Sequence, residues 1–155
     1  MPFTVNVKGK PLDIKFNYRM VFKANKKLGS INTETKEHNP DGAGVLFAKV
    51  LEQDDDALFE VIDLASREKL TENEIFEAIE DFFSKFEDEE EAYDAIFDQM
   101  KNEMVLSGFF KKKIKKYVEN LEKVIDALKQ KKDEDSKLQV ASIQELADKM
   151  KKEIS

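Results

Sequence analysis

Apolar side chains recur every three or four residues through most of the chain after residue 45, and this spacing restricts the fold more than any other feature. Such a row runs along one face of an α-helix. The clearest row consists of Ile75, Ile79, Phe82 and Phe86. Comparable rows predict further helices over residues 45–51, 54–65, 93–104, 110–128 and 143–154. We therefore predict a mainly α protein.

Local signals place several helix ends. Thr71 and Glu74 have the spacing of a capping box, in which each residue caps the other's backbone N–H group. Ser142 and Glu145 repeat that spacing and predict the start of the last helix. Because residues 129–137 are almost wholly charged, we predict a linker there. The expected organisation is a domain over residues 1–130, followed by a charged linker and a C-terminal amphipathic helix over residues 131–155.

The first sixteen residues follow a different pattern. Apolar and polar residues alternate on both sides of Gly9 and Lys10, which is typical of two β-strands joined by a tight turn. The apolar positions are Phe3, Val5, Val7, Leu12, Ile14 and Phe16. A lone hairpin is marginally stable in water. The predicted fold is thus an N-terminal β-hairpin packed on a multi-helix domain, with a C-terminal helical tail.

Between the hairpin and residue 45, the sequence predicts one helix and one loop. Val21, Phe22, Asn25 and Leu28 mark the packed face of a helix that ends at Gly29. Residues 30–44 are polar and rich in helix breakers, so they are predicted to form a loop that includes the Gly-Ala-Gly of positions 42–44. His38 lies in this loop, where a solvated side chain is expected.

The residues offer little for catalysis or metal binding. The chain has no cysteine and a single histidine, so thiolate chemistry and thiolate metal sites are excluded. The acidic run that begins at Asp133 does not form a calcium loop, because Leu138 occupies the position that requires glycine. No nucleophile motif or phosphate loop is present. We expect a protein that binds other proteins, without catalytic activity, cofactor or metal.

The charge is unevenly distributed along the chain. Residues 1–36 carry eight basic and two acidic side chains, residues 52–103 carry four and twenty, and residues 104–155 carry thirteen and nine. This layout could let copies stack head to tail through complementary surfaces, or it could mark the solvated faces of helices. The acidic middle disfavours a nucleic-acid partner. Because no apolar run reaches the ~20 residues of a membrane span, no membrane partner is expected.

Two sets of apolar side chains are candidates for partner binding. Phe83, Phe109 and Phe110 lie off the main apolar rows or at a break between helices, which favours their exposure. The second set lies on the C-terminal helix, beyond the charged segment, and could dock on a neighbour or a client: Ile143, Leu146, Met150 and Ile154. Apolar side chains of this kind can line a groove for an amphipathic helix.

The order of these signals resembles the tail assembly chaperones of long-tailed phages (siphoviruses) and prophages of Gram-positive bacteria. The likeness covers roughly residues 3–125 and rests on these segments: the hairpin, Tyr18-Arg19-Met20-Val21-Phe22 to Gly29, Gly42-Ala43-Gly44, Leu51 to Leu58, Ala65-Ser66-Arg67-Glu68-Lys69-Leu70-Thr71, and Ala78-Ile79-Glu80-Asp81.

The resemblance implies a function. Chaperones of this family bind the tape measure protein, a long and aggregation-prone helical chain, and keep it soluble until tail-tube protein polymerises around it. They self-associate into homo-oligomers, act in the host bacterial cytoplasm and are not part of the mature virion. The alternative is a structural tail or head–tail completion protein that is retained in the virion.

Overall fold

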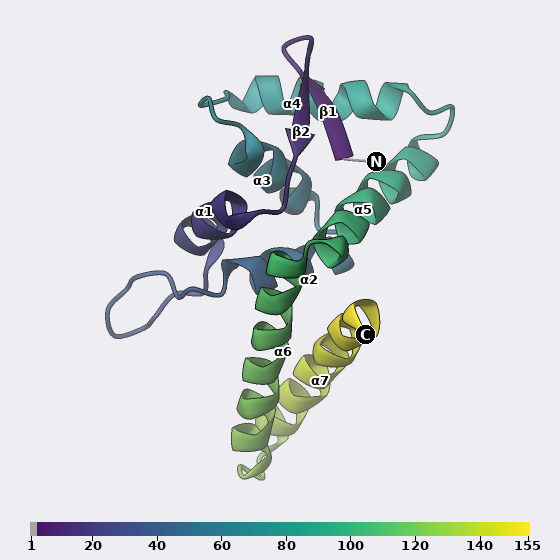
Figure 1. Ribbon diagram of the computed structural model, residues 1–155. Helices are drawn as coiled ribbons and strands as arrows, with labels where there is room; N and C mark the ends of the chain where they lie inside the picture. Colours follow the sequence, from purple (N-terminus) through teal and green to yellow (C-terminus); the bar gives the residue numbers. More distant parts are fainter. Residues whose placement is uncertain (1–2) are drawn as a thin grey trace.

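The structure is a computed structural model that describes residues 3–155. Within that range, a two-stranded antiparallel hairpin precedes seven helices (Figure 1). The mainly α fold predicted from the sequence is confirmed. The elements are β1 (Phe3–Val7), β2 (Lys10–Ile14), α1 (Tyr18–Leu28), α2 (Gly42–Leu51), α3 (Asp55–Ala65), α4 (Glu72–Ser84), α5 (Glu89–Leu106), α6 (Gly108–Lys129) and α7 (Glu134–Ile154).

The hairpin turns over two residues, Lys8 and Gly9. Both have positive φ, 55° and 76°, as in the type I′ turns that suit the twist of a hairpin. The turn therefore starts one residue earlier than predicted, and Lys10 is the first residue of β2. β1 packs on α4, where the rings of Phe3 and Phe82 meet edge to face with centroids 6.2 Å apart.

Most helix starts are capped by side chains that the sequence supplies nearby. The predicted capping box opens α4: Glu74 N–H donates to Thr71 Oγ1 at 3.2 Å, and Thr71 N–H donates to Glu74 Oε1 at 2.9 Å. Ser107 separates α5 from α6 and accepts a hydrogen bond from Phe110 N–H at 3.2 Å. Its hydroxyl also donates to Phe16 O at 2.6 Å. The break between α5 and α6 is thereby tied to the segment that follows the hairpin.

The predicted loop over residues 30–44 is too long, because α2 begins at Gly42. Glycines at positions 42 and 44 let α2 approach its neighbours closely: a Cβ on Gly42 would overlap with the backbone of Ala24, and one on Gly44 with the side chain of Tyr117. Gly42 N–H also donates to Asn25 Oδ1 at 2.9 Å. Helix α2 is consequently held against α1 on one side and α6 on the other.

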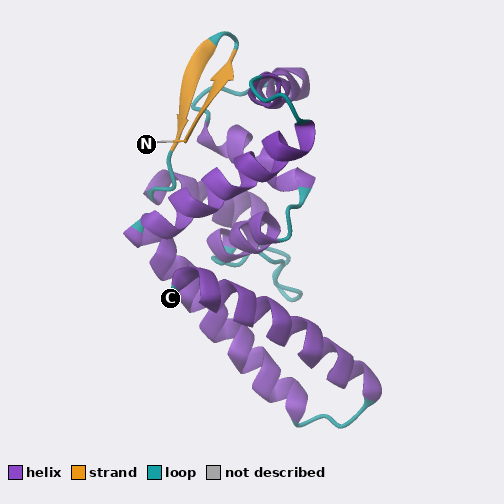
Figure 2. Cartoon of the chain, turned by 90° about the vertical axis from the view of Figure 1, so that its right-hand side faces the viewer, coloured by secondary structure: helices purple, strands orange, loops and turns teal. Residues whose placement is uncertain are grey.

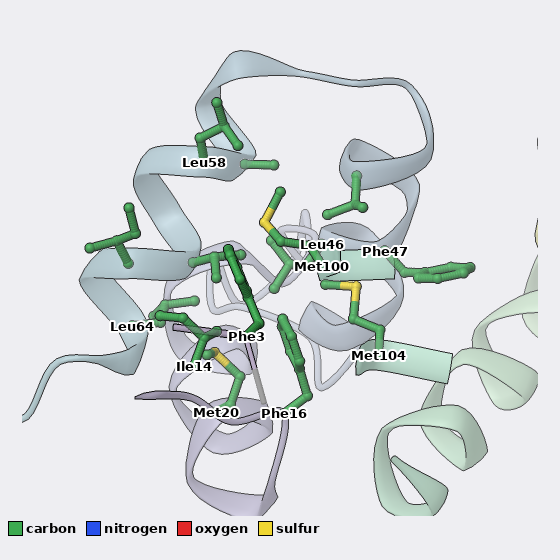
Figure 3. Packing of buried hydrophobic residues seen from close by; sticks show 14 of the residues in the cluster. Phe3, Ile14, Phe16, Met20, Leu46, Phe47, Leu58, Leu64, Met100 and Met104 are labelled. Atoms are coloured by element: carbon green, nitrogen blue, oxygen red, sulfur yellow. The ribbon is translucent and has the colours of Figure 1, made fainter. Parts of the chain in front are cut away.

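One continuous apolar core joins the hairpin to the helices. Figure 3 shows Phe3, Phe16 and Met20 from the N-terminal segment in the same cluster as Met100 and Met104 of α5. All five side chains are buried. The N-terminal forty residues and the C-terminal half of the chain therefore fold around the same centre.

The C-terminal helix begins earlier than the sequence predicts. Helix α7 starts at Glu134, capped by Asp133, which accepts a hydrogen bond from Ser136 N–H at 2.8 Å. The connection to α6 is only residues 130–133, and Ser142 lies inside α7, so its predicted capping role is wrong. Charged residues that suggested a linker instead form the first turn of a helix, where acidic side chains are favoured.

Helices α6 and α7 form an antiparallel hairpin that projects from the rest of the molecule (Figures 1 and 2). The projecting end contains the short connection, and the opposite end of α7 returns to the body. There the buried side chains of Met150 and Ile154 join the core. Two ion pairs flank this contact: Lys149–Glu52 at 3.3 Å, which is exposed, and Lys101–Glu153 at 3.5 Å, which is half-buried.

Candidate protein-binding surfaces

An apolar groove opens to solvent between α3 and α4, with α5 at one end. Its volume is about 620 Å³. We call it the acidic groove; its lining residues are Asp55, Asp56, Leu58, Phe59, Glu72, Phe76, Ile79, Phe83 and Tyr93. Of these described residues, the charged ones are all carboxylates. The groove thus presents apolar side chains within a negative rim.

A second apolar row on α4 builds the groove floor. Ile75, Ala78 and Phe82 form the buried face of α4. Phe76, Ile79 and Phe83, at i, i+3 and i+7, line the groove instead, so Ile79 of the predicted row lies at the edge of the buried face. The ring of Phe76 lies 5.9 Å from that of Phe59 on α3 and is still 47% exposed. Together with Phe59, Ile79 and Phe83 it forms a contiguous apolar surface, and contiguous exposed apolar surfaces are typical of protein-binding sites.

Tyr93 closes one end of the groove. Its hydroxyl lies 2.7 Å from both Gln53 O and Asp55 Oδ1, and its one proton can be donated to either. Burial, the hydrogen bond to Asp55 and the negative charges of Asp55, Asp54 and Asp94 raise the pKa of Tyr93 to about 12. The carboxylates therefore create a negative potential at this end of the groove, which favours positively charged ligands.

A second exposed aromatic surface lies on α1 and α6. We call it the basic patch and define it by Tyr18, Phe22 and Phe109 with Lys26 and Lys113. The ring of Tyr18 lies 6.3 Å from that of Phe22 and 5.8 Å from that of Phe109. Lys26 Nζ lies 5.1 Å from the centre of the Phe22 ring, and Lys113 Nζ lies 5.4 Å from that of Phe109.

The structure separates the three phenylalanines chosen from the sequence. Phe83 is half-buried and lines the acidic groove, and Phe109 is 39% exposed in the basic patch. The exposure expected for Phe110 is wrong, because its side chain is fully buried. It meets Phe16 edge to face at 5.3 Å, since the start of α6 turns this residue toward the core.

The four C-terminal candidate residues differ in their exposure. Met150 and Ile154 are buried against the chain's own core, so they do not form a free surface. Ile143 and Leu146 are half-buried and line a cleft of about 430 Å³ between α7 and α2. Met150, Ile154 and Leu146 therefore hold α7 to its own chain. A role in binding a partner remains a prediction for Ile143 and Leu146.

Three exposed aromatic residues were missed from the sequence: Tyr18, Phe22 and Phe76. Phe22 was assigned to the packed face of its helix, but the structure buries Met20, Val21 and Ala24 and leaves Phe22 50% exposed. The signal for the basic patch was the spacing of Tyr18, Phe22 and Lys26 at i, i+4 and i+8. The signal for the groove was the second row on α4 that contains Phe76.

The single histidine and the acidic side chains were the other candidates for a functional site. His38 is exposed, and its Nδ1 lies 2.5 Å from Gly29 O at the end of α1. Within residues 3–155, no three His, Cys, Asp or Glu side chains are arranged to hold a metal ion. No helix in the same range is both long and apolar enough to cross a bilayer.

Comparison with known proteins assigns the family. A family model described as phage tail assembly chaperone protein, TAC, matches residues 4–119, which is most of the chain. The chain belongs to the phage tail assembly chaperone family. The match runs from β1 into α6, so it includes the elements that form the acidic groove and the basic patch. No curated protein and no solved structure gives a significant match to this tail assembly chaperone.

Proposed function

We propose that this tail assembly chaperone binds the tape measure protein and keeps it soluble until tail-tube protein polymerises. The observation that carries the proposal is the acidic groove, an apolar surface open to solvent in a member of a family of tail assembly chaperones. A long helical client exposes apolar side chains before it is packaged. Covering those side chains removes the surface through which client chains would aggregate.

The groove has the chemistry needed to hold an amphipathic helix. Such a helix would place apolar side chains against Phe76, Ile79 and Phe83 at the spacing of successive helix turns. Basic side chains beside that apolar row would meet Asp56 and Glu72 on the rim. We therefore propose that the bound segments of the tape measure protein are helical and carry lysine or arginine beside their apolar face.

The remaining steps follow from a chaperone that binds reversibly. In this proposal the protein acts in the host bacterial cytoplasm, forms homo-oligomers and is absent from the mature virion. Tail-tube protein displaces it when tube subunits cover the tape measure protein. The protein itself contributes binding and no catalysis.

Co-expression tests the proposal and the site together. The tape measure protein of the same phage is produced in bacteria alone, with the parent chaperone, or with one of two variants, and its soluble fraction is measured. We expect the parent to raise the soluble fraction several-fold and Phe76→Glu to abolish the gain, because a charge would stand in the apolar groove. Leu138→Glu is the matched control, since Leu138 is 69% exposed on α7 and outside the groove.

Two results would contradict the proposal. If the soluble fraction of the tape measure protein is the same with and without the parent chaperone, the client is wrong. If Phe76→Glu is folded and solubilises the client as well as Leu138→Glu does, the acidic groove is not the site. Circular dichroism of both variants establishes that they are folded.

A further inference from the structure

We propose that, in the absence of client, the basic patch of one chain docks in the acidic groove of a second copy. Self-association and client binding would then compete for the same surface. This inference rests on the groove as the client site and adds a way in which its occupancy is regulated. It assigns a particular pair of surfaces to the contact between copies.

The two surfaces match in chemistry. The groove offers apolar and aromatic side chains with a rim of Asp55, Asp56 and Glu72. The basic patch offers exposed aromatic rings, with Lys26 and Lys113 lying over two of them. Apolar area would be buried on both sides, and each lysine would exchange solvent for a carboxylate partner.

Part of the basic patch lies on a helix that carries aromatic and basic side chains in one row, as a ligand of the acidic groove should. Tyr18, Phe22 and Lys26 follow one another along α1 at four-residue spacing, so this helix presents two aromatic rings and a cation in one row. That is the pattern expected of a helix held by an apolar groove with an acidic rim. The same chain thus carries both a groove and a helix that fits its chemistry.

The arrangement requires two molecules. The patch is built on α1 and α6, and the groove on α3, α4 and α5, so they share no element. Phe22 and Phe76 are both about half exposed in the isolated chain, which shows that its own patch does not fill its own groove. Contacts between different surfaces of identical chains are head to tail, and they extend into rings or open chains of copies.

Such pairing would have a direct benefit for a chaperone whenever its client is absent. An apolar groove and an exposed aromatic patch would otherwise remain in contact with water and with unrelated proteins. Docking one against the other would cover both. The client would then release the chains from one another by occupying the grooves.

Complementation between two variants tests the pairing. Phe22→Glu breaks the patch and leaves the groove intact, whereas Phe76→Glu breaks the groove and leaves the patch intact. We expect the parent to form species larger than a dimer in light scattering, and each variant alone to have the mass of one chain. An equimolar mixture should give the mass of two chains and nothing larger, because one good patch and one good groove remain.

A third variant serves as the control for this experiment. Leu138→Glu, near the start of α7 and outside both surfaces, should assemble as the parent does. A monomeric parent, variants that assemble like the parent, or a mixture that stays monomeric would each overturn the inference. Because Phe22→Glu keeps the groove, it should still solubilise the tape measure protein; the client result and the assembly result can therefore fail independently.

Competition is tested with a synthetic peptide in place of the client. An amphipathic helical peptide of leucine, alanine and lysine should reduce the parent assemblies to the mass of single chains with bound peptide. A peptide with glutamate at every lysine position should leave them intact, because the rim repels it. Equal effects of the two peptides, or no effect of either, would overturn the competition.

Discussion

The side chain of Tyr117 on α6 lies directly against Gly44 on α2, with no space for even a methyl group between them. This contact lets α2, at the centre of the molecule, pack closely against α6. It explains why Gly44, in a stretch that looks like loop sequence, lies in a buried helix. Glycine in a helix has an entropic cost, and here the close packing of α2 on α6 offsets it.

We predict that Gly44→Ala destabilises the protein although alanine favours helices. A new Cβ would overlap with the Cβ and Cγ of Tyr117, which cannot move without displacing α6. Overpacking of this kind outweighs the gain in helix propensity, and the free energy of unfolding should fall by about 1–2 kcal/mol. Gly108→Ala is the matched control, because nothing lies within 4 Å of its Cβ position. Urea denaturation should show no loss of stability for the control.

We predict opposite outcomes for two neighbouring phenylalanines. Phe110→Ala removes a fully buried ring and should lower the free energy of unfolding by about 3–5 kcal/mol. Phe109→Ala removes a ring that is 39% exposed and should cost less than about 1 kcal/mol. Chemical denaturation of the two variants compares them directly. Equal losses would contradict the assignment of Phe110 to the core and Phe109 to the surface.

Tyr93 should make stability depend on pH in the alkaline range. Its pKa is raised to about 12 in the folded chain, against 10.0 for an ordinary tyrosine. Between pH 10 and 12 the unfolded chain loses this proton while the folded chain keeps it, so stability falls as the pH rises. The melting temperature of the parent should therefore fall more steeply over this range than that of Tyr93→Phe.

At neutral pH, Tyr93→Phe should cost about 1 kcal/mol, the usual contribution of a hydrogen bond. The lost bond links α5 to Gln53 and Asp55 at the start of α3. If the melting temperatures of parent and variant fall by the same amount from pH 10 to 12, Tyr93 does not titrate as described.

We predict that residues 1–130 fold without α7. The family match ends at residue 119, and most of the core lies in the preceding elements. Deletion of residues 131–155 exposes apolar surface that Met150 and Ile154 cover, so the melting temperature should fall while helical circular dichroism and a cooperative transition remain. Loss of cooperative unfolding would contradict a separate domain boundary near residue 130.

Several parts of this fold follow from local chemistry, and the sequence predicts them correctly. Alternation in the first sixteen residues specifies a hairpin, because side chains on a strand point to opposite faces. Thr71 and Glu74 specify the start of α4, because the cap involves residues three apart. Ser107 marks the break between α5 and α6 for the same reason. Such features are encoded by residues close together in the chain, so they can be predicted without knowledge of the tertiary contacts.

The wrong sequence predictions concern features that depend on contacts between distant parts of the chain. Gly42 begins a helix because Ala24 and Asn25 lie against it, and these contacts span 17 or more residues. Phe110 is buried because Phe16 reaches it from the far end of the chain. A helical row shows which side chains share a face, but not which of two rows meets the core. That ambiguity hid the second row on α4 and placed Phe22 on the wrong side of α1.

The amino-acid sequence by itself determined the mainly α class, the hairpin, the helix starts with nearby caps and the uneven charge. Tertiary structure alone decided which aromatic side chains remained exposed and which charges surrounded them. Exposure depends on how distant helices pack, since each helix offers more apolar surface than its neighbours cover. The acidic groove and the basic patch are the apolar surfaces that this packing left uncovered.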